Sequence, residues 1–418
     1  MIYVIGAGLA GLSAAVALAG AGEAVTVIEA AAQAGGRCRS YPDPILGLTL
    51  DNGNHFILSG NHAAFAYLGA IGSADRMIGP EEATLDFLDR RDGARWRIHP
   101  NPGPVPWWLA SPRRRVAGTR LADYLPLLAL IAPPRRLRIS EVMACRGVLW
   151  DRLIGPFLLG ALNTDPREAS AALAAAVIRE SLARGGRAYR VRIAHPTLSA
   201  AFVDPALAFL ERHGAAVMFG RPVRGLVFDG DRVRAIETAG GDIALALDDA
   251  AILAAPPWIA QALVPGLAAP DRFNTIVNGH FAYAPPAGAA PMVGVIGGAA
   301  EWVFAFPDRL SVTVSGADAI ADDDREDLAR RFWNDVAAVH GLPPEVPPYR
   351  IIKERRATFA ATPEQDARRP GAETAWRNLT LAGDWTATGL PATIEGTIRS
   401  GGKAARMTLE ARRRAVIR

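Results

Sequence analysis

Residues 2–20 have the sequence IYVIGAGLAGLSAAVALAG: a short apolar run rich in β-formers, a turn with glycines at positions 6, 8 and 11, and an alanine- and leucine-rich helix. Gly22 ends this helix, and the run 24–29 that follows alternates like a strand and ends at Glu29. The order of strand, glycine turn, helix and strand predicts a βαβ unit. The G-x-G-x-x-G pattern is informative here because a dinucleotide-binding turn requires it between the first strand and the first helix.

Each residue of this turn has a physical role in dinucleotide binding. Gly6 permits the tight turn, Gly8 lets the backbone approach a pyrophosphate at the helix N-terminus, and Gly11 lets the helix lie close to the strand. Glu29 can accept hydrogen bonds from ribose hydroxyls, and its charge would repel a 2′-phosphate. These residues predict an FAD or an NAD site and do not distinguish between the two cofactors.

The composition is that of a large globular chain. Its 418 residues are 50% hydrophobic and 21% charged, with a net charge of +4, which excludes a disordered chain and gives no support for a nucleic-acid partner. Two cysteines, Cys38 and Cys145, and seven histidines without ligand spacing predict a reducing compartment and no metal site. The chain enters a strand at once and has no long uninterrupted apolar stretch, so we expect a cytoplasmic protein without a signal peptide or membrane span. The absence of a Gly-x-Ser-x-Gly motif leaves serine hydrolysis unsupported.

The rest of the chain alternates between β-rich and helical segments. Asp92-Gly93 predicts a hairpin between 85–88 and 95–98, and the helical periodicity with Pro-rich turns after residue 103 predicts an inserted cap. Glycine-rich turns then separate short strands up to the buried run 250–255. Further predicted elements are helices at 124–131, 148–162, 169–182, 204–212, 323–340 and from about 393, and strands at 216–219, 223–228, 233–238, 243–247, 275–283, 292–296, 302–306, 310–315, 349–354 and 379–382.

Two further glycine motifs accompany the first turn. Gly35-Gly36-Arg37 follows Glu29, and a glycine pair before a fixed cation suits a second contact with a pyrophosphate or flavin. Together with the run 251–257 and Gly383-Asp384, these motifs resemble the FAD-dependent amine oxidase and phytoene desaturase superfamily. Within it, the sequence is most similar to the hydroxysqualene dehydroxylases, the squalene-associated flavoproteins of hopanoid pathways, at DNGNH (51–55), PWW (106–108), ALNT (161–164), EWVF (301–304), KERRATFA (353–360) and 383–396.

The resemblance implies an α/β (α+β) fold with two domains. A Rossmann-like FAD-binding domain would be built from the discontinuous segments 1–65, 200–262 and 372–418. Residues 66–199 and 263–371 would form a substrate domain with an antiparallel sheet and a helical cap at about 103–199.

The resemblance also implies which residues bind the cofactor. Motif matching places the adenine contact at Val223 and a ribityl–pyrophosphate contact at Asp384. The turn that opens the last helix would present backbone N–H groups to the flavin. No cysteine lies near the final strands, so the FAD would be held non-covalently. The predicted FAD-binding residues are Gly6, Gly8, Gly11, Glu29, Gly35, Gly36, Arg37, Gly53, Val223, Gly383, Asp384, Thr393, Ile394 and Glu395.

Departures from the amine-oxidising members concern the substrate. The aromatic residue that those enzymes place before the Glu-Gly of the last helix is Thr393 here, so an aromatic cage for an ammonium loses one side. Their lysine near the flavin corresponds to Asn278, with His280 two residues along the same predicted strand. Together with an apolar cap, these differences favour an isoprenoid lipid over a polar amine.

The leading functional hypothesis is the reductive dehydroxylation of hydroxysqualene to squalene by reduced FAD. This reaction needs an acid near the hydroxyl group and a dry apolar channel. His55 is the candidate acid or orienting group, and Asn54, Asn163, Asn278 and His280 are candidate polar partners. An oxidative carotenoid or phytoene-type desaturase is the alternative enzyme, and a flavin-containing lipid carrier without turnover is the alternative from another class.

A C30 hydrocarbon has negligible solubility in water, so this substrate would have to enter from lipid. Residues 105–138 combine Trp107-Trp108, the apolar run 125–131 and many arginines, which predicts monotopic binding to an anionic surface of the cytoplasmic membrane. The alternative is a cap with core tryptophans and a solvated basic edge. The oligomeric state stays open. The arginines within residues 105–138 are Arg113, Arg114, Arg115, Arg120, Arg135, Arg136 and Arg138.

Lys353 is one of only two lysines among 46 basic residues. We expect it to pack beneath the site and to hold the neighbouring strand of the substrate domain.

Overall fold

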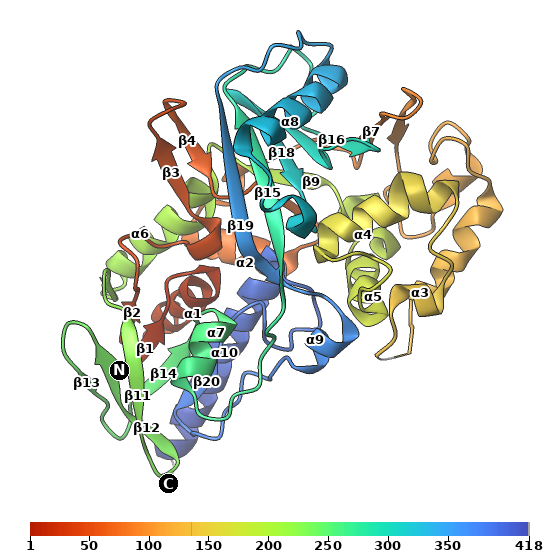
Figure 1. The fold of residues 1–418 in the computed structure, drawn as a ribbon. Coiled ribbons are helices and arrows are strands. Elements are labelled where there is room, and N and C mark those ends of the chain that lie inside the picture. The colour runs from red at the N-terminus through yellow and green to blue at the C-terminus, as the bar shows by residue number, and fades with distance from the viewer. Residues whose placement is uncertain (135, 417–418) are drawn as a thin grey trace.

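The computed structural model describes residues 1–134 and 136–416 and is organised around two large sheets (Figure 1). The first has five parallel strands in the order β10-β2-β1-β14-β20. Its central strands are almost wholly buried, as expected for a parallel sheet that is covered on both faces. The bounds are β1 Ile2–Ile5, β2 Val25–Ile28, β10 Ala216–Met218, β14 Ala250–Leu253 and β20 Leu379–Leu381.

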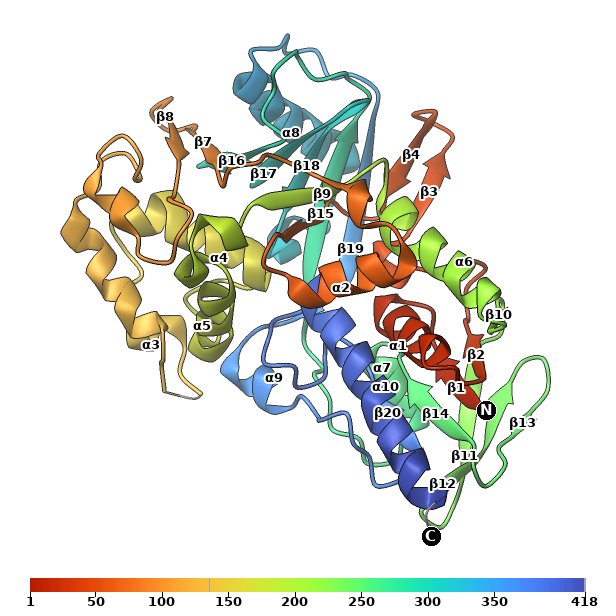
Figure 2. The same ribbon diagram turned by 180° about the vertical axis from the view of Figure 1, so that it is seen from behind.

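Helices from both ends of the chain pack together beside this sheet (Figure 2). A Cβ at Gly401 of α10 would lie 2.2 Å from the carbonyl oxygen of Ala10 in α1, so the two helices cross at a distance that only glycine allows. The strands β11, β12 and β13 form a separate meander that lies between β10 and β14 in the chain. The elements are α1 Leu9–Gly20, α2 His62–Ile71, α6 Asp204–Arg212, α7 Pro257–Leu263, α10 Ile394–Val416, β11 Val223–Asp229, β12 Arg232–Thr238 and β13 Ile243–Ala244.

The second sheet has seven strands in the order β19-β15-β18-β17-β16-β7-β8 and is antiparallel except between β16 and β7. Phe332 and Trp333 of α8 pack on one face of it with Val277 and Phe281. The bounds are β19 Tyr349–Phe359, β15 Phe273–Phe281, β18 Arg309–Val314, β17 Trp302–Phe306, β16 Met292–Ile296, β7 Leu85–Asp89, β8 Arg95–Ile98 and α8 Arg325–His340.

The cap projects beside the second sheet, on the right of Figure 1. Residues 121–130 form 3-10 turns instead of the predicted helix, because Pro126 removes a backbone donor. The predicted helix at 148–162 contains a π-helical turn at 150–154 and continues as an α-helix from residue 155. The α-helices of this region are α3 Ile139–Val142, α4 Gly155–Leu162 and α5 Ala171–Glu180, and α9 Pro363–Ala367 lies outside it.

The mixed α/β fold class is confirmed. Two of the observed elements that the sequence did not predict are α2, which spans the expected domain boundary at residue 65, and β9, a strand inside the segment expected to be a helical cap. β9 pairs with β5 and β6, whereas the predicted strand at 243–247 shortens to two residues. No helix among the described residues is long and apolar enough to span a bilayer. The remaining strands are β3 Ser40–Asp43, β4 Leu48–Asp51, β5 Phe56–Leu58, β6 Met77–Ile78 and β9 Val191–Ala194.

Candidate flavin and substrate site

The first glycine turn has the geometry that close approach to a pyrophosphate requires. Gly6 has a φ of +107°, and a Cβ there would lie 2.7 Å from the Ala254 carbonyl oxygen. A Cβ at Gly11 would lie 1.8 Å from the Gly6 oxygen, so the start of α1 touches the turn. Gly8 differs, because a Cβ there would meet no atom within 4 Å. The protein itself therefore requires glycine at 6 and 11, whereas at Gly8 the space is open for a ligand.

Glu29 lies directly beside this turn at the end of β2. Its carboxylate accepts hydrogen bonds from the backbone N–H groups of Ala7, at 2.6 Å, and Ala31, at 2.8 Å. The Glu29 carbonyl accepts from Arg221 N at 2.9 Å, which brings Val223, the first residue of β11, into the same region. Glu29 and Val223 are both partly exposed and are placed as a ribose and an adenine contact would need.

The second glycine pair packs on the first turn. Gly35 donates to the Ala7 carbonyl at 2.8 Å with a φ of +105°, and a Cβ at Gly36 would lie 3.3 Å from Gly8 Cα. Arg37 then pairs with Asp384 at 2.7 Å. The Arg37 side chain stays 45% exposed, so the guanidinium retains donors for a further anionic group.

Asp384 owes its position to Gly383. A Cβ at Gly383 would lie 2.4 Å from the Trp385 indole nitrogen, and Gly383 N donates to Ser400 Oγ of α10 at 2.9 Å. The Arg37–Asp384 pair therefore joins the two ends of the chain at one place.

The turn that opens α10 holds α2 in place. The Glu395 carboxylate accepts from Ala63 N at 3.1 Å and Ala64 N at 2.9 Å, at the first turn of α2, and pairs with Arg399. Thr393 Oγ1 accepts from Gly396 N at 3.1 Å. The first backbone N–H groups of α10, including Ile394, have no intrahelical acceptor by geometry and suit a flavin contact. The Glu395 side chain itself is structural.

A buried polar cluster lies on the face of the second sheet opposite α8. Asn54 donates to Ser311 Oγ at 2.8 Å and to Thr313 Oγ1 at 3.0 Å, and Thr313 donates to Asn278 Oδ1 at 2.8 Å. His280 Nδ1 lies 2.8 Å from Ser311 Oγ. Ser311 and Thr313 were not predicted as site residues, and it is the pairing of β18 with β15 that places them opposite His280 and Asn278. The structure thus brings three of the five predicted catalytic residues together.

His55 and Gly53 lie next to this cluster. A Cβ at Gly53 would lie 3.3 Å from Asn278 Nδ2 and 3.5 Å from His55 Nε2. Burial and the nearby Arg37 lower the pKa of His55 to about 4. Burial and Arg309 lower the pKa of His280 to about 3, and its Nε2 has no partner among the described residues. Both imidazoles are therefore neutral at neutral pH and can orient a hydroxyl group without supplying a proton as imidazolium.

Asn163 lies apart from the cluster. It ends α4 with a φ of +47°, and its Oδ1 accepts from Gly316 N at 2.6 Å. Its Nδ2 donates to Thr358 Oγ1 at 2.9 Å. These contacts tie the cap to the second sheet, and the predicted catalytic role of Asn163 finds no support in them.

A row of buried aromatic side chains, called the aromatic surface below, continues the polar cluster across the same face. Trp302, Phe304 and Phe306 alternate along β17, and the ring of Phe56 lies 6.5 Å from that of Phe304, centroid to centroid. Phe56 is 37% exposed. A polar cluster beside an aromatic surface suits a long apolar substrate with one hydroxyl group.

Lys353 lies on the other face of this sheet. It pairs with Val277 in β15, and its ammonium group donates to the Asp323 carbonyl just before α8. Lys353 therefore holds the segment before α8 against the sheet and touches none of the residues of the polar cluster.

These residues fit an FAD. Two glycine loops in contact, a helix N-terminus, a carboxylate for ribose and an exposed guanidinium are what its diphosphate and adenosine need. Within residues 1–134 and 136–416, no group of His, Cys, Asp and Glu side chains could hold a metal ion.

Comparison with known proteins agrees with this fit. The family described as flavin containing amine oxidoreductase matches residues 9–409. The chain is 52% identical to a protein named hydroxysqualene dehydroxylase from Rhodopseudomonas palustris, over 99% of both chains. It is 46% identical to one of the same name from Zymomonas mobilis, over 97% of this chain and 98% of the other.

Among solved structures, cyclohexylamine oxidase from Brevibacterium oxydans is similar with a TM-score of 0.71 and 17% identity over 98% of each chain. An oxidoreductase from Methanosarcina mazei has a TM-score of 0.72 and 16% identity over 97% of this chain and 99% of that one. These two likenesses concern the fold alone. The chain belongs to the family of flavin-containing amine oxidoreductases.

Proposed function

We propose that this protein is an FAD-dependent oxidoreductase that converts hydroxysqualene to squalene by reductive dehydroxylation. The observation that carries the proposal is the 46–52% identity, over nearly the whole chain, to three proteins named hydroxysqualene dehydroxylase. The buried polar cluster beside an aromatic surface supports it, because a squalenoid alcohol has one polar group on a long apolar chain. Asn278 in place of an amine oxidase lysine agrees with this substrate.

When bound in its reduced form, FAD supplies a hydride to the carbon that loses its hydroxyl group. The residues of the chain would bind the cofactor, orient the hydroxyl group of the substrate and exclude water. Glu29, the glycine loops and the Arg37–Asp384 pair would hold the adenosine and diphosphate. His55 lies beside Asn278, where a neutral imidazole can orient the hydroxyl group, while the aromatic surface excludes water from the reacting carbon.

The test is anaerobic incubation of chemically reduced protein with hydroxysqualene. We expect the flavin absorbance to return and squalene to appear in the lipid extract. Oxidised protein with a phytoene-type polyene is the parallel sample. Desaturation there without dehydroxylation would overturn the proposal in favour of the oxidative alternative, and lipid binding with unchanged flavin absorbance in both samples would favour a carrier.

We also propose that the cap docks on an anionic membrane surface. Seven of the fourteen large apolar side chains that are exposed among the described residues fall between residues 105 and 148. Leu125 and Leu128 are each 62% exposed, and Trp107 is 58% exposed. Residues 105–138 carry seven arginines and a single acid, Asp123, so the charge complements anionic lipid.

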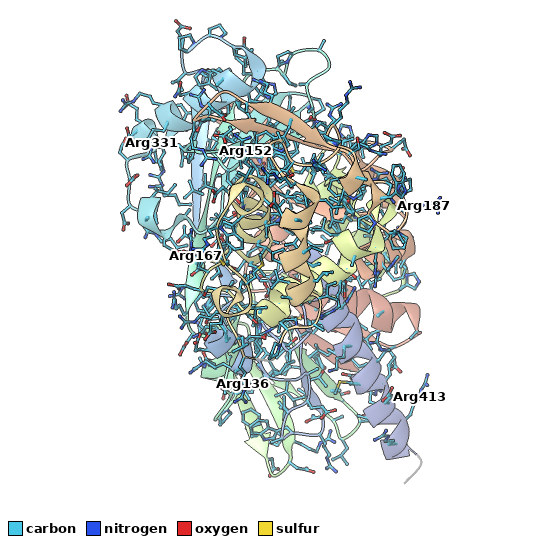
Figure 3. The ribbon with its side chains drawn as sticks, turned by 90° about the vertical axis from the view of Figure 1, so that its right-hand side faces the viewer. Arg136, Arg152, Arg167, Arg187, Arg331 and Arg413 are labelled. Carbon is cyan, nitrogen blue, oxygen red and sulfur yellow. The ribbon has the colours of Figure 1, made fainter. Side chains whose placement is uncertain are left out.

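The structure refines the set of docking residues. Trp108 is buried against Tyr124, and Arg114 and Arg115 donate to backbone carbonyls of the cap, so these three belong to the folded cap itself. Arg135 lies outside the described residues. Figure 3 views the cap from its outer side, where Arg136, Arg167 and Arg187 lie around the face. The docking set is therefore Val105, Trp107, Arg113, Arg120, Leu121, Leu125, Leu128, Ile131, Arg136 and Arg138.

Flotation with vesicles of anionic phospholipid tests this surface. The double change Leu125→Glu and Leu128→Glu removes two apolar anchors, a loss of about 3 kcal/mol or roughly a hundredfold in partitioning. Leu247→Glu is the matched control, because Leu247 is 84% exposed in the distant meander. Flotation that falls equally in both variants, or in neither, would contradict the proposed surface.

A further inference from the structure

Glu301 is a buried acid with no basic partner among the described residues. It precedes β17 and is 9% exposed. Ser315 N donates to its Oε2 at 2.7 Å, and Trp302 Nε1 donates to its Oε1 at 3.2 Å. Burial raises the pKa of Glu301 to about 7, although the hydrogen bonds from Ser315 and Trp302 oppose the rise. A large share of this carboxyl group is therefore protonated at neutral pH.

A glycine faces this carboxyl group from the cap. A Cβ at Gly160 of α4 would lie 3.3 Å from Glu301 Oε1 and 3.0 Å from Trp302 Nε1. A glycine inside a helix costs about 1 kcal/mol relative to alanine. Gly160 is itself exposed, and its missing side chain lets α4 lie directly against this carboxyl group.

The position of Glu301 joins the two parts of the substrate site. Ser315, which binds its carboxylate, lies two residues after Thr313 of the polar cluster. Trp302 begins the aromatic surface that continues through Phe304. Glu301 N also donates to the Thr313 carbonyl oxygen at 3.3 Å, so the acid lies where the aromatic surface meets the polar cluster.

We propose that Glu301 is the proton donor for the hydroxyl group that leaves hydroxysqualene. This role rests on the proposed function. The carbon–oxygen bond breaks with its electron pair on oxygen, the proton of Glu301 joins that oxygen, and water leaves. The carbon accepts a hydride from reduced FAD, which ends oxidised, and the Glu301 carboxylate takes a proton back from solvent. His55 and His280 are neutral imidazoles and do not compete for this role.

The test compares Glu301→Gln with the parent in single turnovers of chemically reduced holoenzyme with hydroxysqualene. Glutamine keeps the size of the side chain and can accept one of the two hydrogen bonds, so we expect normal FAD content and a modest decrease in melting temperature. Flavin reoxidation should slow by about a hundredfold or more, in the range of a lost general acid. The parent needs the protonated acid, so its rate should be constant at low pH and fall as the pH rises through about 7. The variant should lack this fall.

Asp335→Asn is the matched control, because Asp335 is a buried acid on α8, on the other side of the sheet from the polar cluster, that binds Ala299 N, Ala300 N and Arg90. It should lower the melting temperature and leave the pH profile unchanged. If Glu301→Gln does not fold, Gly160→Ala provides the second test, since its methyl group lies against Oε1 and should slow turnover in a folded holoenzyme.

The outcomes separate the two proposals. A Glu301→Gln enzyme with the parent rate and pH profile would overturn the role of Glu301 alone. A parent that forms no squalene would overturn the proposed function, whereas an infrared carboxyl band that titrates near neutral pH and is missing in Glu301→Gln would still establish the buried acid.

Discussion

The substitution Gly8→Ala should weaken FAD binding while leaving the stability of the FAD-free protein nearly unchanged. Gly8 has a φ of −71° and a ψ of 173°, which alanine adopts without strain, and its Cβ would meet no protein atom within 4 Å. The free energy of unfolding of the FAD-free protein should change by less than about 1 kcal/mol, because a weaker N-cap and a less flexible unfolded chain have opposite effects. FAD should bind less tightly by about 1–3 kcal/mol, or roughly 5- to 150-fold, since the methyl group takes the space of the diphosphate.

Gly11→Ala is the matched comparison. Its Cβ would lie 1.8 Å from the Gly6 carbonyl oxygen, so α1 has to move and the FAD-free protein itself should lose about 3 kcal/mol or more. The assays are thermal melting of stripped protein and titration of it with FAD, followed by flavin fluorescence. Full FAD affinity in Gly8→Ala, or a loss of stability equal to that of Gly11→Ala, would refute the assignment of Gly8 to the diphosphate.

Three further changes test other parts of the account. Glu29→Ala should weaken FAD binding by about 1–3 kcal/mol in the same titration, through the lost ribose and Ala7 contacts; unchanged affinity would exclude the ribose role. Trp108→Ala should lower the free energy of unfolding by about 3–5 kcal/mol, whereas Trp107→Ala should change it by less than about 1 kcal/mol and reduce vesicle flotation. Equal losses in the free energy of unfolding, measured with denaturant, for Trp107→Ala and Trp108→Ala would show that both tryptophans are core residues. Lys353→Met should lower stability by about 1–2 kcal/mol and leave turnover intact, and a slower enzyme of normal stability would speak against its position on the α8 side.

Local patterns predicted the cofactor half of the site because its chemistry lies in contiguous motifs. The turn from Gly6 to Gly11 and the pair Gly35-Gly36 each have the backbone geometry that their sequence demands. The sequence also placed Arg37 and Asp384 near the same cofactor by resemblance, although it could not show that the two side chains pair directly.

The substrate half depends on contacts between distant segments, which no local pattern contains. Ser311 and Thr313 join the candidate site only because β18 pairs with β15, and the Asn163 side chain lies apart from it, hydrogen-bonded to Gly316 and Thr358. Glu301 became a candidate acid only through its burial, since a sequence does not show which carboxyl groups lose their solvent.

The most direct test of the central claim is a single turnover of chemically reduced protein with hydroxysqualene in deuterated water. The flavin hydride exchanges with solvent, so we expect squalene with one deuterium on the former hydroxyl carbon, formed in equal amount to the flavin that is reoxidised. Squalene without deuterium at that carbon, or flavin reoxidation without squalene, would contradict it.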